Sequence, residues 1–458
     1  MSLKGNDSLA NRPTLPSWPR RLLRSTLAFF SEVAAHKWLL SFLDQGLVSG
    51  GSFLAGVIIG RTCEKGQFGL YLLGLTIIGL IMEFQNVIIW VPYTVFSPRL
   101  TGSARAFYTG STFLHQLGTS ALGVLALAAG GIYLSRTPGT HDLAGVILIL
   151  AGVGGFYLFR EYARRVCFAA LRAQAALALD SFALFFQLLS LLLLFHLDKM
   201  SAGNAFGVIG LGCGLAVISW LIWAWRDMAF SVTQALSDLG RNWSFGKWVL
   251  GGNLALFLSW QLYPWILAGF QEAAIVGILA ASQGVIALSN PFMQGSAVFL
   301  EARAAHAFAH GGSEGLRRLV LKVTAVMAAV MIIFCLIIFT LGNWLTILIY
   351  GPKYGGQGLV LSLLALSTLA WALEFGLYFG LRVMGRPDLN FKIELIRLLT
   401  TVTLGIWAAK GFGLLGVCWA FLLGNLATGG IRWLVFLKLF YPAGLNKRRF
   451  WQGKDYHG

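Results

Sequence analysis

The chain has 458 residues, of which 57% are hydrophobic and only 12% are charged, with 35 Lys and Arg against 18 Asp and Glu. A soluble domain cannot bury this much apolar surface, so the composition excludes an ordinary globular enzyme and predicts a membrane protein. The net charge of +17 lies mostly beside apolar segments, where it faces anionic lipid, and therefore does not indicate a nucleic-acid partner.

The first 37 residues are predicted to be a basic cytoplasmic tail that ends in an interfacial helix. Three prolines lie between residues 13 and 19, and the apolar core and cleavage site of a signal peptide are missing from this stretch. The segment from Arg20 to Lys37 combines basic and apolar residues in the way that is typical of an amphipathic helix on a membrane surface.

Twelve long apolar segments follow, each near the roughly 20 residues that a helix needs to cross a bilayer core about 30 Å thick. They are predicted at residues 38–60, 68–91, 111–134, 143–159, 176–196, 205–225, 248–269, 275–295, 319–341, 357–380, 395–409 and 412–437. The domains are thus a first bundle at 38–225, a cytoplasmic linker at 226–247, a second bundle at 248–440 and a basic tail at 441–458. The predicted fold is an all-α polytopic membrane protein.

The basic residues predict the orientation of these spans. Of the 35 Lys and Arg, 28 fall into every second gap or the two tails, six fall into the remaining gaps, and Arg432 lies inside the last span. Basic residues near membrane spans are retained on the cytoplasmic side. We therefore expect both chain ends to face the cytoplasm.

The two halves of the chain repeat each other. Three pairs of stretches match in the same order at offsets of 208, 210 and 206 residues: Glu64–Leu70 with Glu272–Ile278, Phe168–Arg172 with Tyr378–Arg382, and Phe206–Gly210 with Phe412–Gly416. Each half holds an even number of spans, so the repeats are parallel and related by a pseudo-two-fold axis along the membrane normal. Transporters built in this way hold their substrate between the halves and rock one half against the other. The linker at 226–247 is the predicted hinge.

Few polar side chains lie within the predicted spans, and these are the candidate site residues. Asp44 and Arg61 bracket the first span near its inner and outer ends, where both also suit the membrane interface. Glu83 lies deep in the second span and shares a helical face with Asn86. A desolvated carboxyl group binds a proton near neutral pH, so Glu83 is either a coupling residue or a neutral structural one.

Further candidates come from the second half of the chain. Glu374 in the tenth span is likewise either an ion-coupling residue or a neutral structural one. Gln261, Gln283 and Asn290 are uncharged hydrogen-bonding residues near aromatic side chains or a proline, which suits sugar hydroxyls. The same residue types also join helices to one another in lipid.

Neither the cysteines nor the histidines predict a metal site. The five cysteines are scattered without a CxxC or Cys/His spacing, and His306 with His310 at i, i+4 lacks a third ligand. The sequence also has no P-loop and no GxSxG motif. We therefore expect no enzymatic activity, no cofactor and no bound metal, with transport driven by an ion or substrate gradient.

Several stretches resemble the bacterial polysaccharide flippases of the multidrug/oligosaccharidyl-lipid/polysaccharide exporter superfamily. The stretches are 43–54, Ile59–Arg61, Gly66–Tyr71, Ala274–Ala281, Leu381–Pro387 and Phe412–Val417. The resemblance covers nearly the whole chain, but its motifs consist mostly of glycines and apolar residues. One departure is Glu301, which stands where relatives often have a proline late in the eighth span.

This resemblance implies a protein of the bacterial inner membrane that moves undecaprenyl-pyrophosphate-linked oligosaccharide from the inner to the outer leaflet for polysaccharide biosynthesis. It implies a lipid-linked oligosaccharide, membrane lipids, a polysaccharide polymerase and glycosyltransferases as partners. Arg61, Arg303 and Arg382 are the expected contacts of the pyrophosphate. The alternatives are a drug or organic-cation antiporter of the same superfamily, and a polymerase or ligase, which would need a larger outside loop than the sequence offers.

Overall fold

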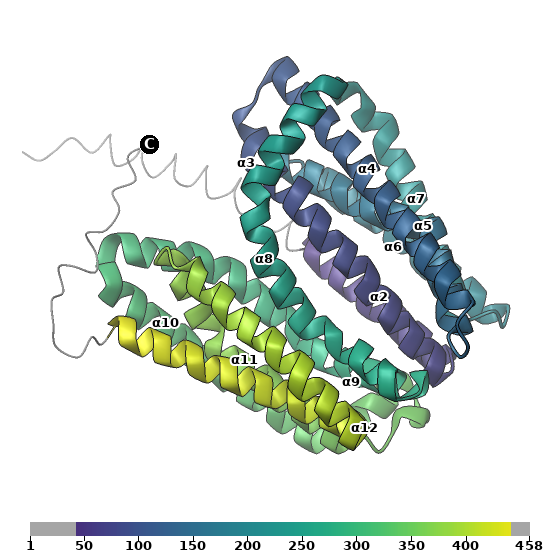
Figure 1. Ribbon diagram of the computed structural model, residues 1–458, viewed down its shortest axis with the longest axis vertical. Coiled ribbons are helices and arrows are strands. Elements are labelled where there is room, and N and C mark those ends of the chain that lie inside the picture. Colours follow the sequence, from purple (N-terminus) through teal and green to yellow (C-terminus); the bar gives the residue numbers. More distant parts are fainter. Residues whose placement is uncertain (1–42, 441–458) are drawn as a thin grey trace, which may run out of the picture.

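The computed structural model describes residues 43–440, apart from the side chains of 248–249, 295, 298–299 and 301–302, and this range consists of helices joined by short turns (Figure 1). The predicted tail at 1–37 with its interfacial helix and the tail at 441–458 lie outside the described residues. The first bundle contains the helix Leu43–Thr62, α2 Lys65–Gln85, η1 Asn86–Trp90, α3 Val91–Phe96, η2 Ser97–Arg99, α4 Gly102–Ser135, α5 His141–Ala169, α6 Ala173–His196, α7 Ala202–Ala224 and η3 Trp225–Asp227. The rest comprises α8 Val232–Phe270, α9 Ala273–Ile286, η4 Ala287–Ser289, α10 Asn290–Tyr350, η5 Pro352–Tyr354, α11 Gly358–Val383 and α12 Pro387–Phe440.

Two of these helices each hold a sharp break. Gly312 in α10 has φ 56° and ψ −153°, and Gly413 in α12 has φ 56° and ψ −134°. Only glycine adopts such angles without strain, so each break separates two membrane-crossing segments. Ten helical segments of the described chain are long and apolar enough to cross a membrane. Dividing α12 at its break and adding the more polar α8 gives the twelve predicted spans.

The spans form two bundles. The bundles meet at one end and diverge toward the other (Figure 1). In the first bundle, α4 packs on α5, and α5 and α6 pack on α7. In the second bundle, α11 packs on α10, α9 and α12, and the C-terminal half of α8 packs on α12. The predicted all-α fold with two six-helix bundles is confirmed.

The bundles join where α2 crosses α9, and the crossing is reciprocal. A Cβ atom on Gly69 would lie 2.1 Å from the carbonyl oxygen of Ala273, and one on Gly277 would lie 1.9 Å from that of Lys65. The offset of 208 residues relates Gly69 to Gly277 and Lys65 to Ala273. The first repeat in the sequence therefore forms a pseudo-two-fold contact, in which two glycines let two backbones touch.

Side chains from both bundles close the same end of the molecule. Tyr350 lies against both Gly60 of the first bundle and Gly284 of the second. Lys353 donates through Nζ to the carbonyl oxygens of Arg61, at 3.1 Å, and Cys63, and so caps the helix Leu43–Thr62. Cys63 is only 3% exposed beneath this contact. On the predicted orientation, this closed end faces the outside of the cell.

The helix α8 connects the bundles along its length. Its N-terminal half includes most of the predicted linker, and there the hydroxyl group of Tyr108 donates to Asn242 Oδ1 at 2.9 Å. Its C-terminal half packs in the second bundle, where Thr401 Oγ1 donates to the carbonyl oxygen of Ser259 at 3.1 Å. The segment predicted to be a hinge is thus mainly a continuous helix docked on the first bundle.

Candidate functional site

The candidate site centres on Glu83, near the C-terminal end of α2. Two contacts align α2 with α8: Trp265 Nε1 donates to Thr76 Oγ1 at 2.6 Å, and Gly79 lies against the ring of Phe257. One turn farther along, Glu83 is half-buried, and its carboxyl group has two hydrogen-bonding neighbours, Asn86 of η1 and Asn253 of α8. Glu83 therefore lies where the first bundle faces the helix that leads into the second.

A π-helical turn, η1, begins directly after the helical segment that carries Glu83. Gln85 lies on the opposite side of α2 from Glu83, and its side-chain amide donates to Thr119 and Ser120 of α4, each at 3.2 Å. These bonds hold α2 to its own bundle and direct Glu83 away from it. π-Helical turns inside α-helices occur frequently at functional sites. Within the described structure, Glu83 Oε2 is buried without a hydrogen-bond partner, so the site holds a polar atom that a proton or cation would satisfy.

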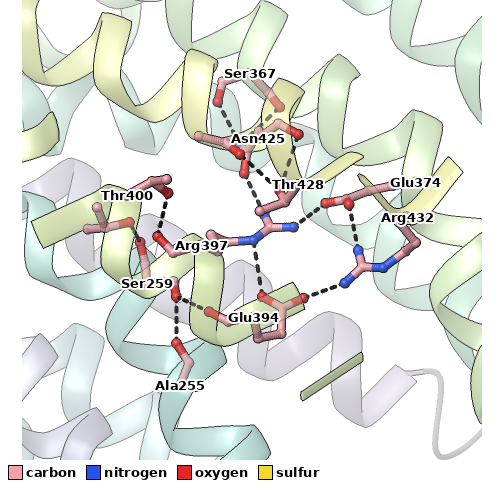
Figure 2. Close-up of polar contacts among 12 residues, drawn as sticks. Ala255, Ser259, Ser367, Glu374, Glu394, Arg397, Thr400, Asn425, Thr428 and Arg432 are labelled. Atoms are coloured by element: carbon pink, nitrogen blue, oxygen red, sulfur yellow. Dashed lines mark hydrogen bonds and ion pairs between the residues drawn. The ribbon is translucent and has the colours of Figure 1, made fainter. Parts of the chain in front are cut away.

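A second group of charged residues is buried inside the second bundle (Figure 2). Arg432 Nη1 contacts Glu374 Oε2 at 2.5 Å, and its Nη2 contacts Glu394 Oε1 at 2.7 Å. Arg397 binds the other oxygen of Glu374 and lies 3.0 Å from Glu394 Oε2. These four side chains are at most 4% exposed. Two carboxylates and two guanidinium groups make the cluster neutral.

Polar and aromatic neighbours complete this cluster. Asn425 Oδ1 accepts from Arg397 Nη1 at 2.5 Å, and its amide donates to Ser367 Oγ at 2.8 Å (Figure 2). The guanidinium of Arg397 lies 5.7 Å from the ring centre of Trp260, a distance typical of cation–π contact. Both oxygens of Glu374 are thus held by arginines, and the residue predicted to couple an ion is part of a closed network.

The first bundle holds a related cluster between α5, α6 and the helix Leu43–Thr62. Arg164 Nη2 lies 2.7 Å from Asp44 Oδ2, and its Nε lies 2.8 Å from Asp180 Oδ2. Arg160 lies 2.6 Å from the other oxygen of Asp180. Asp44 and Asp180 are completely buried. Asp44 was predicted near the inner mouth of the substrate path, and the structure places it inside an ion-pair cluster of the first bundle.

The two clusters lie at corresponding positions of the two repeats. At these positions a basic residue in one repeat corresponds to an acidic residue in the other. An offset of 210 residues, which aligns Phe168–Arg172 with Tyr378–Arg382, sets Arg164 of α5 opposite Glu374 of α11. In both bundles the fourth and fifth membrane helices are therefore joined by a buried ion pair. The sequence analysis did not predict this pairing. It assigned Arg160, Arg164 and Arg397 to the loops between spans, where basic residues determine the membrane orientation. The repeat offset was the signal that could have revealed it.

The remaining predicted residues are spread along the molecule. Arg61 is exposed at the closed end, whereas Arg303 and Arg382 are exposed on α10 and α11. Gln261 and Gln283 are half-buried on α8 and α9, and Asn290 is exposed at the start of α10.

Comparison with solved structures shows which fold this is. The chain is similar to a multidrug resistance MATE family transporter of the MOP superfamily in its inward-facing conformation, with a TM-score of 0.71 and 12% identity over 86% of this chain and 94% of that one. For a multidrug resistance MATE family transporter in its outward-facing conformation, the TM-score is 0.56 and the identity is 10%, over 88% of this chain and 94% of that one. The chain is also similar to a MOP superfamily transporter from Pyrococcus furiosus that is described as having a binding pocket of reverse polarity. The TM-score is 0.61 and the identity 11%, over 88% of this chain and 94% of that one.

These similarities establish a MATE-like fold with two six-helix bundles. No protein-family model matches the sequence, and no curated protein matches it. The similarity therefore does not by itself assign a substrate or an activity.

Proposed function

We propose that the chain is a membrane transporter that works by alternating access between its two bundles. The observation that carries this proposal is the reciprocal crossing at Gly69 and Gly277, which joins two pseudo-symmetric bundles at one end and leaves them diverging at the other (Figure 1). The fold shared with MATE transporters supports it, as does the higher TM-score against an inward-facing structure than against an outward-facing one. On the predicted orientation, the described conformation is inward-facing.

The proposal includes coupling to an ion gradient through Glu83. Its carboxyl group lies where the first bundle meets α8, the helix that leads into the second bundle, and one of its oxygens is buried without a partner in the described structure. Glu374 stays a predicted coupling residue, but binding an ion there would require its two arginine contacts to break. Glu83 is therefore the stronger candidate.

Replacing Glu83 with Gln tests this coupling. Glutamine keeps the size and hydrogen bonding of the side chain but cannot release a proton, so we expect gradient-driven transport in proteoliposomes to be lost while protein yield and substrate binding persist. Glu314→Gln on the exposed part of α10 is the matched control and should transport normally. If the Glu83→Gln protein shows full gradient-driven transport, Glu83 does not couple transport to the ion gradient and has only a structural role.

For the substrate, we propose an undecaprenyl-pyrophosphate-linked oligosaccharide, moved across the bacterial inner membrane for polysaccharide biosynthesis. The sequence resemblance to polysaccharide flippases supports this class. A second support is that Gln261 and Gln283 are half-buried and Asn290 is exposed, and such uncharged hydrogen-bonding side chains suit sugar hydroxyls. A polysaccharide polymerase and glycosyltransferases are the corresponding partners.

A substrate that carries a pyrophosphate group requires cationic side chains along its path through the protein. An arginine holds phosphate oxygens through two parallel charge-assisted bonds, so Arg61→Ala or Arg303→Ala should weaken transport of a labelled pyrophosphate-linked oligosaccharide about tenfold or more. Arg→Lys should restore it only in part, because the planar fork is lost. Normal transport by both alanine variants would contradict a pyrophosphate path through these residues.

The second candidate function is a drug or organic-cation antiporter. The carboxyl group of Glu83 beside the exposed ring of Phe84 favours it, and so does the structural similarity to a multidrug resistance MATE family transporter. The same proteoliposomes distinguish the two functions, because an antiporter should move an organic cation such as ethidium and should not require Arg61 or Arg303.

A further inference from the structure

A separate cavity lies at one end of the first bundle, at the junctions between α3 and α4, between α5 and α6, and after α7. Its volume is about 400 Å³. The lining residues that matter for its chemistry are Gly102, Arg105, Arg172, Trp220, Arg226 and Asp227. All of these residues precede α8, so the cavity belongs to the first bundle. The charge pattern predicts that this end faces the cytoplasm.

The wall of this cavity carries an excess of positive charge. Arg172 lies 3.0 Å from Asp227 and 4.7 Å from the ring centre of Trp223. Arg105 and Arg226 have no ion-pair partner among residues 43–440. Asp227 is the only carboxylate among the lining residues, so three guanidinium groups face one negative charge.

An indole donor in the same wall lacks an acceptor. Trp220 is only 5% exposed, and its Nε1 is buried without a hydrogen-bond partner in the described structure. The thiol of Cys167, which also lines the cavity, is its neighbour and is only a weak acceptor. An indole N–H can only donate, and leaving it unsatisfied costs free energy. An acceptor atom bound in the cavity would satisfy it.

The N-terminus of α4 adds further donors. This helix of 34 residues begins at Gly102, which lines the cavity, and its N-cap residue Thr101 makes no side-chain capping bond. The first N–H groups of a long helix carry partial positive charge and bind anions. Arginine side chains, an indole N–H and a helix N-terminus share one preferred ligand, an anion rich in acceptor oxygens.

We propose that this cavity is a binding site for a phosphate group, separate from the transport site at Glu83. The predicted orientation places it at the depth of the inner-leaflet headgroups, and the exposed side chains of Trp223 and Trp225 suit that interface. The phosphate comes either from a phospholipid headgroup or from free phosphate in the cytoplasm. Arg105, Arg226 and the Trp220 indole are its contacts.

Native mass spectrometry of the full-length protein in detergent, titrated with dioleoyl phosphatidylglycerol, tests the site. We expect one bound lipid whose affinity falls about tenfold in Trp220→Phe, which removes the N–H but keeps an aromatic ring, and about a hundredfold in Arg105→Gln/Arg226→Gln. Trp225→Phe and Arg99→Gln change the same residue types outside the cavity and should bind as the unaltered protein does.

Competition with millimolar inorganic phosphate separates the two sources. Displacement of the lipid shows that free phosphate occupies the site, whereas retention assigns it to the lipid headgroup. Unchanged lipid binding in both Trp220→Phe and Arg105→Gln/Arg226→Gln, with unfolding temperatures equal to that of the unaltered protein, overturns the proposal.

Discussion

Arg397→Ala is expected to lower the free energy of unfolding by about 3–5 kcal/mol, the usual cost of removing one member of a buried ion pair. The substitution leaves Glu374 and Glu394 with only Arg432 between them, so the cluster gains a net negative charge in the apolar interior of the second bundle. It also removes the donor to Asn425 Oδ1 and the cation near the ring of Trp260.

Thermal unfolding of the purified protein in detergent measures this effect. Arg386→Ala is the matched control, because Arg386 pairs with Asp388 at 3.1 Å with both side chains more than a third exposed, and such pairs contribute about 0–1 kcal/mol. The double variant Glu374→Gln/Arg397→Met keeps the cluster neutral and should unfold at a higher temperature than Arg397→Ala. Equal unfolding temperatures for Arg397→Ala and Arg386→Ala would show that the buried network does not stabilise the bundle.

Gly277→Ala is expected to abolish transport by preventing closure of the end where the bundles meet. The added methyl group would lie 1.9 Å from the carbonyl oxygen of Lys65, a backbone atom that no side-chain rotation can displace. The helices α2 and α9 must therefore separate. Gly69→Ala should act in the same way, because its methyl group meets the carbonyl oxygen of Ala273 at 2.1 Å.

The exposure of Cys63 reports on this separation. Its side chain is 3% exposed beneath the contact between Lys353 and the helix Leu43–Thr62. In cells, Gly277→Ala should accelerate its modification by a membrane-impermeant maleimide added from outside, measured by peptide mass spectrometry. Gly66→Ala is the control, because its methyl group would meet only ordinary contacts near 3.9 Å. Slow labelling of Cys63 in Gly277→Ala would contradict either the closure role of this glycine or the predicted orientation.

The candidate site was only partly predictable from the sequence. Glu83 stood out because a carboxyl group deep in an apolar segment is costly and must face a partner or a polar space. That its neighbour is Asn253, and that Gln85 ties the other side of α2 to α4, depends on contacts between helices distant in the chain. No local pattern encodes those contacts.

The sequence by itself determined the membrane class, the twelve spans and the repeat, because hydrophobic length and residue spacing act locally along the chain. Only the tertiary structure decided that Asp44, Arg164 and Asp180 form one cluster, and that Glu374, Glu394, Arg397 and Arg432 form another. A single charge in an apolar helix has the same local signature whether it faces a substrate, lipid headgroups or an opposite charge. The physical reason is that the free energy of a buried charge is set by its neighbours on other helices, and only packing brings those neighbours together.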